Sequence, residues 1–270
     1  MSANASDSSS ASHLSILLIE PSEVQRKVIT RHLKNAGVEQ IEGVGSIAEA
    51  KQKLAYANPD LVASAMYFSD GTADDLLDFM FSHNHLRDIP FMLVSSEHKR
   101  NYLEQYKQAG VVAILPKPFT IDHLQRALNA TIDLIEPQTM QLKNFETEDL
   151  HVLVVDDSTT SRHYLTRVLN SIGVEAVAEA ESGDQAIAYL SEHSVDLIVT
   201  DYHMPNMNGD EFASRVRAQL NDAHVPILMV SARADELTLE QIEQAGVNAL
   251  SDKPFEPATL RALLSRILDI

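Results

Sequence analysis

LIVTDYHMPNMNG, from Leu197 to Gly209, begins as an apolar run rich in β-branched residues and stops at one acid, Asp201. The Met204-Pro205 pair and Gly209 cannot continue a strand or open a helix at once. This pattern predicts a buried parallel strand that presents a carboxylate at its C-terminal end, with a loop folded over it. In open α/β sheets, that edge is where ligands bind.

Polar residues also end three other apolar runs in this half of the chain. The first run presents Asp156 and Asp157, the second Ser231 and the third Lys253. If the four strand ends lie side by side, three carboxylates, a hydroxyl and an ammonium meet in one pocket, which suits a divalent cation and a phosphoryl group. The three runs read HVLVVDDS (151–158), ILMVSA (227–232) and ALSDKPF (249–255).

The chain contains two copies of one pattern, offset by 136 residues, which is the separation of Lys117 from Lys253. Both lysines precede Pro-Phe, and the quartet QAGV occurs at 108–111 and again at 244–247. One register held without a gap indicates a duplication. Each copy has about 120 residues, a usual domain size.

Each copy alternates apolar strands with amphipathic helices, which predicts an α/β fold with a doubly wound, five-stranded parallel sheet. Four glycines stand where helix C-caps are expected, at positions 37, 110, 173 and 246. In the first copy we expect strands over 15–19, 38–44, 61–65, 91–95 and 111–115, and helices over 23–35, 47–57, 73–83, 98–108 and 121–136. In the second copy we expect helices over 161–171, 183–193, 210–220, 237–244 and 258–268.

These elements predict two tandem (βα)5 domains, over residues 14–136 and 151–270. The polar segment 137–150 begins with proline and is expected to be a linker. Residues 1–13 are small and polar, without the basic and apolar regions of a signal peptide, so we expect a disordered tail.

Composition limits the classes of function. The 270 residues are 44% apolar, include no cysteine and carry a formal net charge of -18. Such a charge argues against a nucleic-acid surface, and no apolar run approaches the roughly 18 residues of a membrane span. We therefore expect a cytoplasmic protein that binds neither nucleic acid nor membrane. Its more acidic second half favours basic or metal-bearing partners.

Each residue type in the predicted pocket has a chemical task. Oxygen ligands suit Mg²⁺, and a cation offsets the repulsion among three carboxylates. Asp201 can attack phosphorus, as carboxylates do in aspartyl-phosphate enzymes. Lys253 and the Ser231 hydroxyl can stabilise negative charge on the transferred oxygens.

The motifs VLVVDDS, LIVTDYHMPNMNGDEF, ILMVSA and DKPF, in this order and spacing, resemble the receiver domain of bacterial two-component response regulators. The resemblance covers nearly all of residues 151–270 and implies a flavodoxin-like fold with strand order 2-1-3-4-5. It makes Asp201 the phospho-acceptor, served by a histidine kinase or histidine phosphotransfer protein. It also implies a Mg²⁺ or Mn²⁺ site formed by Asp157 directly, Asp156 mostly through water, Asp201, and the backbone carbonyl of His203.

The same resemblance assigns residues around the acceptor. Ser231 would bind a phosphoryl oxygen and move with it, and Lys253 would pair with the phosphoryl group. Many family members carry Tyr or Phe three residues before this lysine, whereas this chain has Leu250, which puts the usual aromatic switch in doubt. His203 and Arg233 stand where family members influence the phosphoryl lifetime, and plain exposure is the alternative for both.

At the same offset, the first copy lacks the acceptor and most of the acids. Alanine cannot accept a phosphoryl group and proline cannot bind a metal through its side chain, so this copy resembles a degenerate receiver that is not phosphorylated. We expect it to be a scaffold or a dimerisation surface, with its lysine no longer facing an acid cluster. The equivalent residues are Glu20, Pro21, Ala65, Ser95 and Lys117.

Several other polar residues have plainer interpretations. Asp70, Asp74 and Asp75 follow the lost acceptor, and we expect helix-capping acids rather than a replacement site. The histidines have no consistent metal spacing and are expected mostly at the surface, as for His163, His193, His203 and His224.

The favoured function is a receiver-only response regulator that signals by binding a downstream protein target, with a homodimer left open. It would not be an enzyme beyond self-catalysed phosphoryl transfer and slow autodephosphorylation. The alternatives are a phosphate sink or relay, and an N-terminal fragment of a larger regulator that has lost its output domain. A phosphatase of the aspartyl-nucleophile class would need an acid where His203 stands, and a flavin module would need a phosphate loop after Val155.

Overall fold

The computed structural model describes the chain except for residues 1–10, 98, 144–145, 220–223, 235–243 and 270. The chain divides into two compact units, one of residues 1–106 and 111–135, the other of residues 107–110 and 136–270. The expected tail falls mainly on residues outside the described part, but Ala11 is described and buried.

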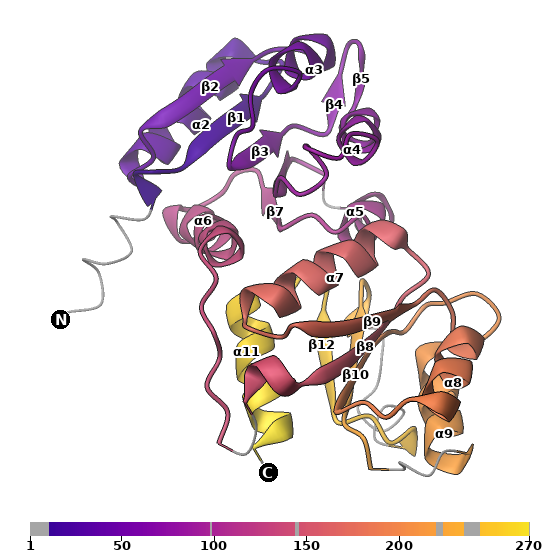
Figure 1. The fold of residues 1–270 in the computed structure, drawn as a ribbon. Helices are drawn as coiled ribbons and strands as arrows, with labels where there is room; N and C mark the ends of the chain where they lie inside the picture. The colour runs from indigo at the N-terminus through magenta and orange to yellow at the C-terminus, as the bar shows by residue number, and fades with distance from the viewer. Residues whose placement is uncertain (1–10, 98, 144–145, 220–223, 235–243, 270) are drawn as a thin grey trace. The chain divides into compact units, whose positions relative to one another are not determined.

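The first unit is a parallel five-stranded sheet in the order β2-β1-β3-β6-β7 (Figure 1). A short antiparallel hairpin, β4 and β5, follows the third strand of the sheet. The strands are β1 (Ser15–Ile19), β2 (Gln40–Val44), β3 (Leu61–Ser64), β4 (Tyr67–Phe68), β5 (Gly71–Thr72), β6 (Phe91–Ser95) and β7 (Ala113–Pro116). The helices are α2 (Glu23–Asn35), α3 (Ile47–Leu54), α4 (Ala73–Phe81), α5 (Arg100–Gln108, of which residues 107 and 108 count with the second unit) and α6 (Ile121–Ile135).

The second unit repeats this sheet in the order β9-β8-β10-β11-β12. Helices α7 and α11 contact each other, as do α8 and α9, and the two pairs cover opposite faces of the sheet (Figure 1). The strands are β8 (His151–Val155), β9 (Ala176–Ala180), β10 (Leu197–Asp201), β11 (Ile227–Ser231) and β12 (Ala249–Asp252). The helices are η1 (Thr147–Asp149), α7 (Thr159–Ser171), α8 (Gly183–Glu192), α9 (Gly209–Gln219) and α11 (Pro257–Leu268).

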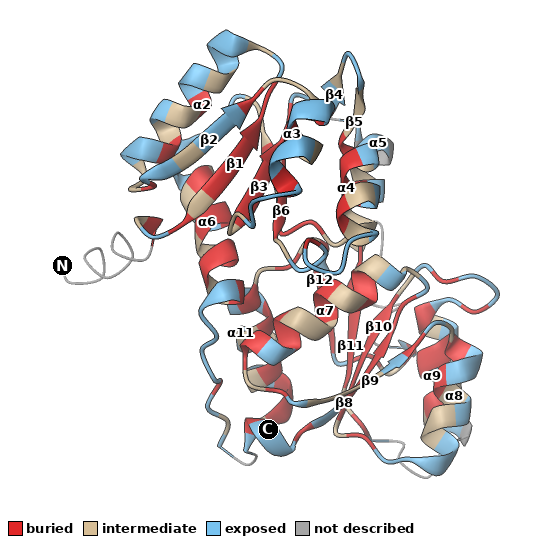
Figure 2. Cartoon of the chain, turned by 45° about the horizontal axis from the view of Figure 1, so that its top comes forward, coloured by how far each residue is buried: buried red, intermediate tan, exposed pale blue. Residues whose placement is uncertain are grey.

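Both sheets have the predicted flavodoxin-like order 2-1-3-4-5 when their main strands are numbered along the chain. Strands β3, β6, β10 and β11 are buried along their whole length (Figure 2). Helices cover both faces of such strands, so their sequences read as continuous apolar runs instead of alternating ones. The α/β class predicted from those runs is therefore confirmed for both units.

Serine N-caps recur at matching places in the two units. Ser46 accepts a hydrogen bond from Glu49 N at 3.2 Å, and Ser182 accepts one from Gln185 N at 3.3 Å. These bonds satisfy backbone donors that the first helical turn leaves open, which fixes where α3 and α8 begin. The four glycines predicted as C-caps all have positive φ, at positions 37, 110, 173 and 246.

The observed elements differ from the sequence predictions mainly at their ends and in one additional hairpin. Helix α3 ends at Leu54, and α7 begins at Thr159, two residues before its predicted start. The β4–β5 hairpin was not predicted. The helix expected over 237–244 lies almost wholly outside the described residues.

Part of the segment expected to be a linker packs against the second unit. Gln138 N donates to Ser171 O at 2.9 Å, and Met140 N donates to Ile172 O at 2.8 Å. Met140 and Leu150 are buried. These contacts hold the segment along the C-terminal end of α7. In the part of the chain that the structure describes, no helix has the length and apolarity needed to span a membrane.

Candidate functional site

The carboxyl ends of three strands bring the predicted acids and lysine of the second unit together. Strands β8 and β10 pair in register with Val155 opposite Thr200, so Asp156 and Asp201 follow at the same level of the sheet. Lys253 comes directly after β12. All three side chains are buried, with 0% exposed surface for each acid and 1% for the lysine.

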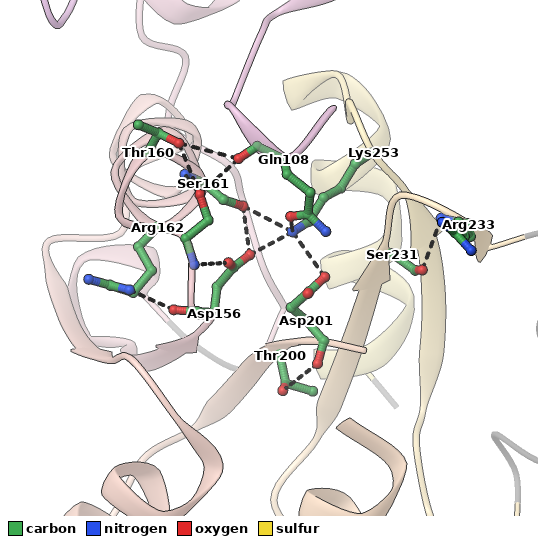
Figure 3. Close-up of polar contacts among 11 residues, drawn as sticks. Gln108, Asp156, Thr160, Ser161, Arg162, Thr200, Asp201, Ser231, Arg233 and Lys253 are labelled. Carbon is green, nitrogen blue, oxygen red and sulfur yellow. Dashed lines mark hydrogen bonds and ion pairs between the residues drawn. The ribbon is translucent and has the colours of Figure 1, made fainter. Parts of the chain in front are cut away.

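Lys253 lies between the two buried acids (Figure 3). Its Nζ is 2.6 Å from Asp156 Oδ2 and 2.9 Å from Asp201 Oδ1. Nζ also donates to Ser161 Oγ at 3.0 Å. A buried ammonium is costly unless it is paired and hydrogen-bonded, and these contacts satisfy that condition.

Asp156 is fixed by the start of helix α7. Its Oδ1 accepts from Ser158 N at 2.8 Å and its Oδ2 accepts from Ser161 Oγ at 2.6 Å. Arg162 Nη1 donates to the Asp156 backbone carbonyl at 2.6 Å. The first turn of helix α7 therefore holds this carboxylate in one position.

Asp201 differs from Asp156 in having an open carboxylate. Although Oδ1 forms an ion pair with Lys253, neither Asp201 oxygen accepts a well-directed hydrogen bond from the residues that the structure describes. Burial raises the pKa of Asp201 to about 6, opposed by the charge of Lys253 and reinforced by that of Asp156. A buried oxygen with no such partner is free to bind a cation or to react.

The loop after Asp201 passes very close to its backbone. Gly209 N donates to Tyr202 O at 2.8 Å and closes this loop. A Cβ at position 209 would lie 2.4 Å from the Asp201 carbonyl oxygen, closer than real contacts allow. In the first unit the equivalent residue is Ala73, which is fully buried and donates from its N to Met66 O at 3.0 Å.

The acids of the second unit fit a divalent cation. Asp156, Asp157 and Asp201 each offer a carboxylate oxygen, and these oxygens lie within 4.8 Å of one another. Three carboxylates and one ammonium carry a formal charge of two negative units, and one Asp201 oxygen has neither an ion-pair nor a hydrogen-bond partner among the described residues. Oxygen donors with a net negative charge are what Mg²⁺ and Mn²⁺ prefer.

The remaining predicted residues surround this cluster. Ser231 is buried at the end of β11, and its Oγ accepts from Arg233 N at 3.0 Å. Leu250 lies in β12 and packs against the hydrophobic core, so no aromatic side chain occupies this place. His203 is exposed, and its ring meets Tyr202 edge-on with centroids 4.7 Å apart.

The other histidines for which a surface position was expected follow that pattern in part. His193 and His224 are exposed, whereas His163 is half-buried. His193 stacks on Tyr189 with ring centroids 4.3 Å apart.

The first unit keeps the lysine but surrounds it differently. Lys117 Nζ donates to Glu20 Oε2 at 2.5 Å and to Gln25 Oε1 at 2.7 Å. Lys117 therefore faces no acid cluster, as expected, yet it retains one acid partner. Pro21 is exposed and Ala65 is buried. Ammonium and carboxylate together give this pair a formal charge of zero.

Two further features are shared by the two units. Ser95 accepts from Glu97 N at 3.0 Å, which matches the contact at the end of β11. The peptide bond after each lysine, Lys117-Pro118 and Lys253-Pro254, is cis.

The acids that follow Ala65 in the first unit make structural contacts. Asp70 Oδ2 accepts from Ala48 N at 2.9 Å at the start of α3, and Asp75 caps α4 by accepting from Thr72 N at 2.8 Å. Asp74 accepts from the hydroxyl of the buried Tyr106 at 2.9 Å. The contacts of Asp70 and Asp75 agree with the capping interpretation, whereas Asp74 contacts a side chain of helix α5 instead of a helix N-terminus.

Sequence reasoning did not identify Ser161 and Arg162 as parts of the site. From the sequence alone, Ser161 is recognisable only as a residue at the start of a predicted helix. The repeat held a usable signal for Arg162, because Arg26 stands at the equivalent position and donates to the Glu20 carbonyl in the same way.

Comparison with known proteins places the chain in a family. The model of the response regulator receiver domain matches residues 16–129 and again residues 152–265. The chemotaxis protein CheY-3 of Vibrio cholerae serotype O1 is 34% identical over 122 residues, which is 45% of this chain and 94% of that protein. The chemotaxis protein CheY of Pseudomonas aeruginosa is 35% identical over 120 residues, or 44% of this chain and 97% of that protein.

A solved structure of the chemotaxis response regulator CheY4 of Vibrio cholerae is 34% identical, with a TM-score of 0.41, and covers 44% of this chain and 98% of its own. The two doubly wound units, each with a lysine at the carboxyl edge of its sheet, define a tandem α/β protein. With two family matches that cover most of its length, the chain belongs to the response regulator receiver family and contains two receiver domains in tandem. Such domains act in two-component signalling, in which they interact with histidine kinases or phosphotransfer proteins.

Proposed function

We propose that the second receiver accepts a phosphoryl group on Asp201. The observation that carries this proposal is the open carboxylate of Asp201, which is buried, 2.9 Å from Lys253 Nζ and adjacent to two further acids. A partly protonated, desolvated carboxylate is a weak nucleophile in isolation. A nearby ammonium and a bound cation would keep it ionised at neutral pH.

The proposed transfer conserves atoms and charge without a proton step. A carboxylate oxygen of Asp201 forms a bond to phosphorus, and the bond from phosphorus to the donor breaks. The donor atom, a histidine ring nitrogen or the carboxylate oxygen of a small acyl phosphate, leaves with the electron pair. Lys253 already lies beside the accepting carboxylate, so its charge is available to the transferred oxygens throughout.

We assign Asp156, Asp157 and Asp201 as the residues that hold Mg²⁺ or Mn²⁺, with the backbone carbonyl of His203 as the fourth protein ligand. When bound, the cation supplies positive charge to the phosphoryl oxygens. Asp157 is the exposed member of the group, so it provides the open side from which a hydrated ion can enter. Ser231 would bind a phosphoryl oxygen, and His203 and Arg233 would adjust the phosphoryl lifetime.

The first receiver is proposed to be degenerate and not phosphorylated. Ala65 offers no nucleophile, and Glu20 is already neutralised by Lys117 at 2.5 Å. With neither an acceptor nor a net negative charge at this edge, the unit keeps the receiver scaffold without its chemistry. A scaffold or dimerisation role fits these features.

The proposed signal is a change in protein binding after phosphorylation by a histidine kinase or phosphotransfer protein. The chain would then be a switch and not an enzyme with a turnover of its own. One observation favours a phosphate sink or relay instead. Leu250 occupies the position at which many family members have the Tyr or Phe of the aromatic switch. A phosphorylated form that decays within seconds without changing any partner would support the sink.

Intact-mass spectrometry with a small acyl phosphate and Mg²⁺ tests the acceptor assignment. The parent should gain one phosphoryl group that hydroxylamine removes, as an acyl phosphate requires. Asp201→Ala should gain none, and Asp157→Asn should gain the group far more slowly. Asp184→Ala is the matched control, because Asp184 is an exposed acid in the first turn of α8. Two groups on the parent, or a label that persists in Asp201→Ala, would contradict the proposal.

A further inference from the structure

We propose that Ser161 is a positioning residue whose hydroxyl holds Lys253 and Asp156 in the arrangement from which Asp201 becomes phosphorylated. This inference rests on the proposed function of the second receiver. Ser161 is not one of the residues to which the proposed function assigns a role, because it belongs to helix α7 and not to a strand end.

Ser161 joins two charged groups that are far apart in the sequence. Its Oγ donates to Asp156 Oδ2 at 2.6 Å and accepts from Lys253 Nζ at 3.0 Å. The lysine and Asp156 are themselves 2.6 Å apart, so the three side chains form a closed triangle (Figure 3). The serine is 3% exposed and the other two are almost fully buried, so water does not compete freely for these contacts.

The triangle restricts a side chain that is otherwise flexible. A lysine ammonium is a compact charge on a four-carbon stem, and fixing such a stem costs conformational entropy. The Ser161 hydroxyl offsets part of this entropy cost by accepting a hydrogen bond from Lys253, and it does so without a charge of its own. A further carboxylate at this place would add negative charge to a site that already has an excess of two. The hydroxyl therefore holds Lys253 without reducing the charge that it offers to Asp201.

The first receiver provides a second, independent observation. Gln25 stands at the position equivalent to Ser161, and its Oε1 accepts from Lys117 Nζ at 2.7 Å. The acids around the two lysines differ. In both units, however, a neutral side-chain oxygen from the first turn of the equivalent helix, α2 or α7, accepts a hydrogen bond from the lysine. This recurrence indicates that the contact holds the lysine in place, whatever acids are present.

The first test measures Lys253 directly in metal-free protein. Proton exchange of the Lys253 ammonium can be followed by NMR on lysine labelled with ¹⁵N. Ser161→Ala should speed this exchange by about tenfold, the change expected when one hydrogen bond to a charged group is lost. Ser161→Thr, which keeps the hydroxyl, should stay close to the parent.

Ser171→Ala is the matched control. Ser171 is also a buried serine of helix α7, and its hydroxyl donates to the Val168 carbonyl at 2.8 Å, at the other end of the helix. Its loss should lower stability without changing Lys253 exchange. A change of the same size in Ser171→Ala would assign the effect of Ser161 to general loosening of the helix and overturn the proposal.

The second test measures the rate at which a small acyl phosphate phosphorylates Asp201 with saturating Mg²⁺. Ser161→Ala should slow the reaction by about tenfold, with recovery in Ser161→Thr, because one hydrogen bond to a charged group is involved. Unchanged exchange and an unchanged rate in Ser161→Ala would refute the role of Ser161. If the parent itself takes up no phosphoryl group, the proposed function fails, whereas the exchange measurement still decides whether Ser161 holds Lys253.

Discussion

Lys117 and Lys253 occupy the same place in the same fold, yet they face different charges. Lys117 pairs with the single acid Glu20, whereas Lys253 lies between two buried acids with a third close by. Both sheets have the same strand order and the same cis peptide bond after the lysine. The receiver scaffold therefore does not depend on the acid cluster, and the two units differ in charge at a few positions at the strand ends.

The largest expected effect comes from restoring the acids of the first receiver. The triple variant Glu20→Asp, Pro21→Asp and Ala65→Asp should take up a second phosphoryl group, because it recreates the charge pattern that faces Lys253. Intact mass with a small acyl phosphate and Mg²⁺ measures this change from one group to two.

The single variant Ala65→Asp is the control for that experiment. It provides an acceptor, but Pro21 cannot bind a metal through its side chain and Lys117 remains paired with Glu20. It should therefore stay at one group. A second label on this single variant would show that the acids proposed to bind the metal are not what separates the two units.

A smaller effect is expected in the pH dependence of stability without divalent cations. Burial raises the pKa of Asp201 to about 6 from an ordinary value of 3.8, so the folded state holds this proton more tightly than the unfolded state does. The resulting stabilisation is complete below the unfolded pKa and is lost as the pH rises through the folded pKa. A shift of this size corresponds to about 3 kcal/mol.

Asp201→Asn removes this titration. In urea unfolding with EDTA, its stability relative to the parent should therefore rise by up to about 3 kcal/mol between pH 4 and pH 8. The first receiver has Ala65 at this position and should show no such dependence. If the difference in unfolding free energy between parent and variant did not change with pH, the pKa of Asp201 would not be raised in the metal-free folded state.

Mg²⁺ should stabilise one unit and not the other. At a concentration one hundred times its dissociation constant, a ligand that binds only the folded state adds about 2.7 kcal/mol. Hydrogen exchange read by mass spectrometry should show this protection in β8 and β10 but not in β1 and β3. Asp157→Asn should lose most of it, and equal protection in both sheets would contradict the division of roles.

The smallest effect should be the same in both units. Ser46 and Ser182 cap equivalent helices, with bonds of 3.2 and 3.3 Å to backbone N–H groups. Replacing either serine by alanine should cost about 1 kcal/mol in its own unit. Thermal unfolding of the two variants checks this equality. A clear difference would show that the scaffolds themselves have diverged, and not only their sites.

Much of the fold could be predicted from local patterns. Buried parallel strands read as short apolar runs, and a gap-free repeat indicated two copies of one topology. The ends of elements were harder, because caps and tertiary contacts decide them. The β4–β5 hairpin escaped prediction because its strands have two residues each and depend on Gly71, whose φ of 152° other residues rarely adopt.

The candidate site divides in the same way. Asp156, Asp201 and Lys253 could be located because each follows an apolar run and parallel strands meet at one edge. Ser161 could not, because a serine in a first helical turn is common. Its meaning depends on Lys253, which is 92 residues away along the chain. The two units also show that similar sequence positions can keep a contact while changing the residue, as Gln25 does.

Gly209 and its counterpart Ala73 suggest a rule for reading other sequences. A methyl group at 209 would lie 2.4 Å from the backbone carbonyl oxygen of Asp201, whereas the first receiver buries the methyl of Ala73 next to a loop that forms the β4–β5 hairpin. The glycine is therefore required by the shape of this loop, and a receiver sequence with alanine eight residues after the strand end is expected to form a hairpin there instead. Surveying that position across genomes would identify other receivers whose loop resembles the one in the first unit.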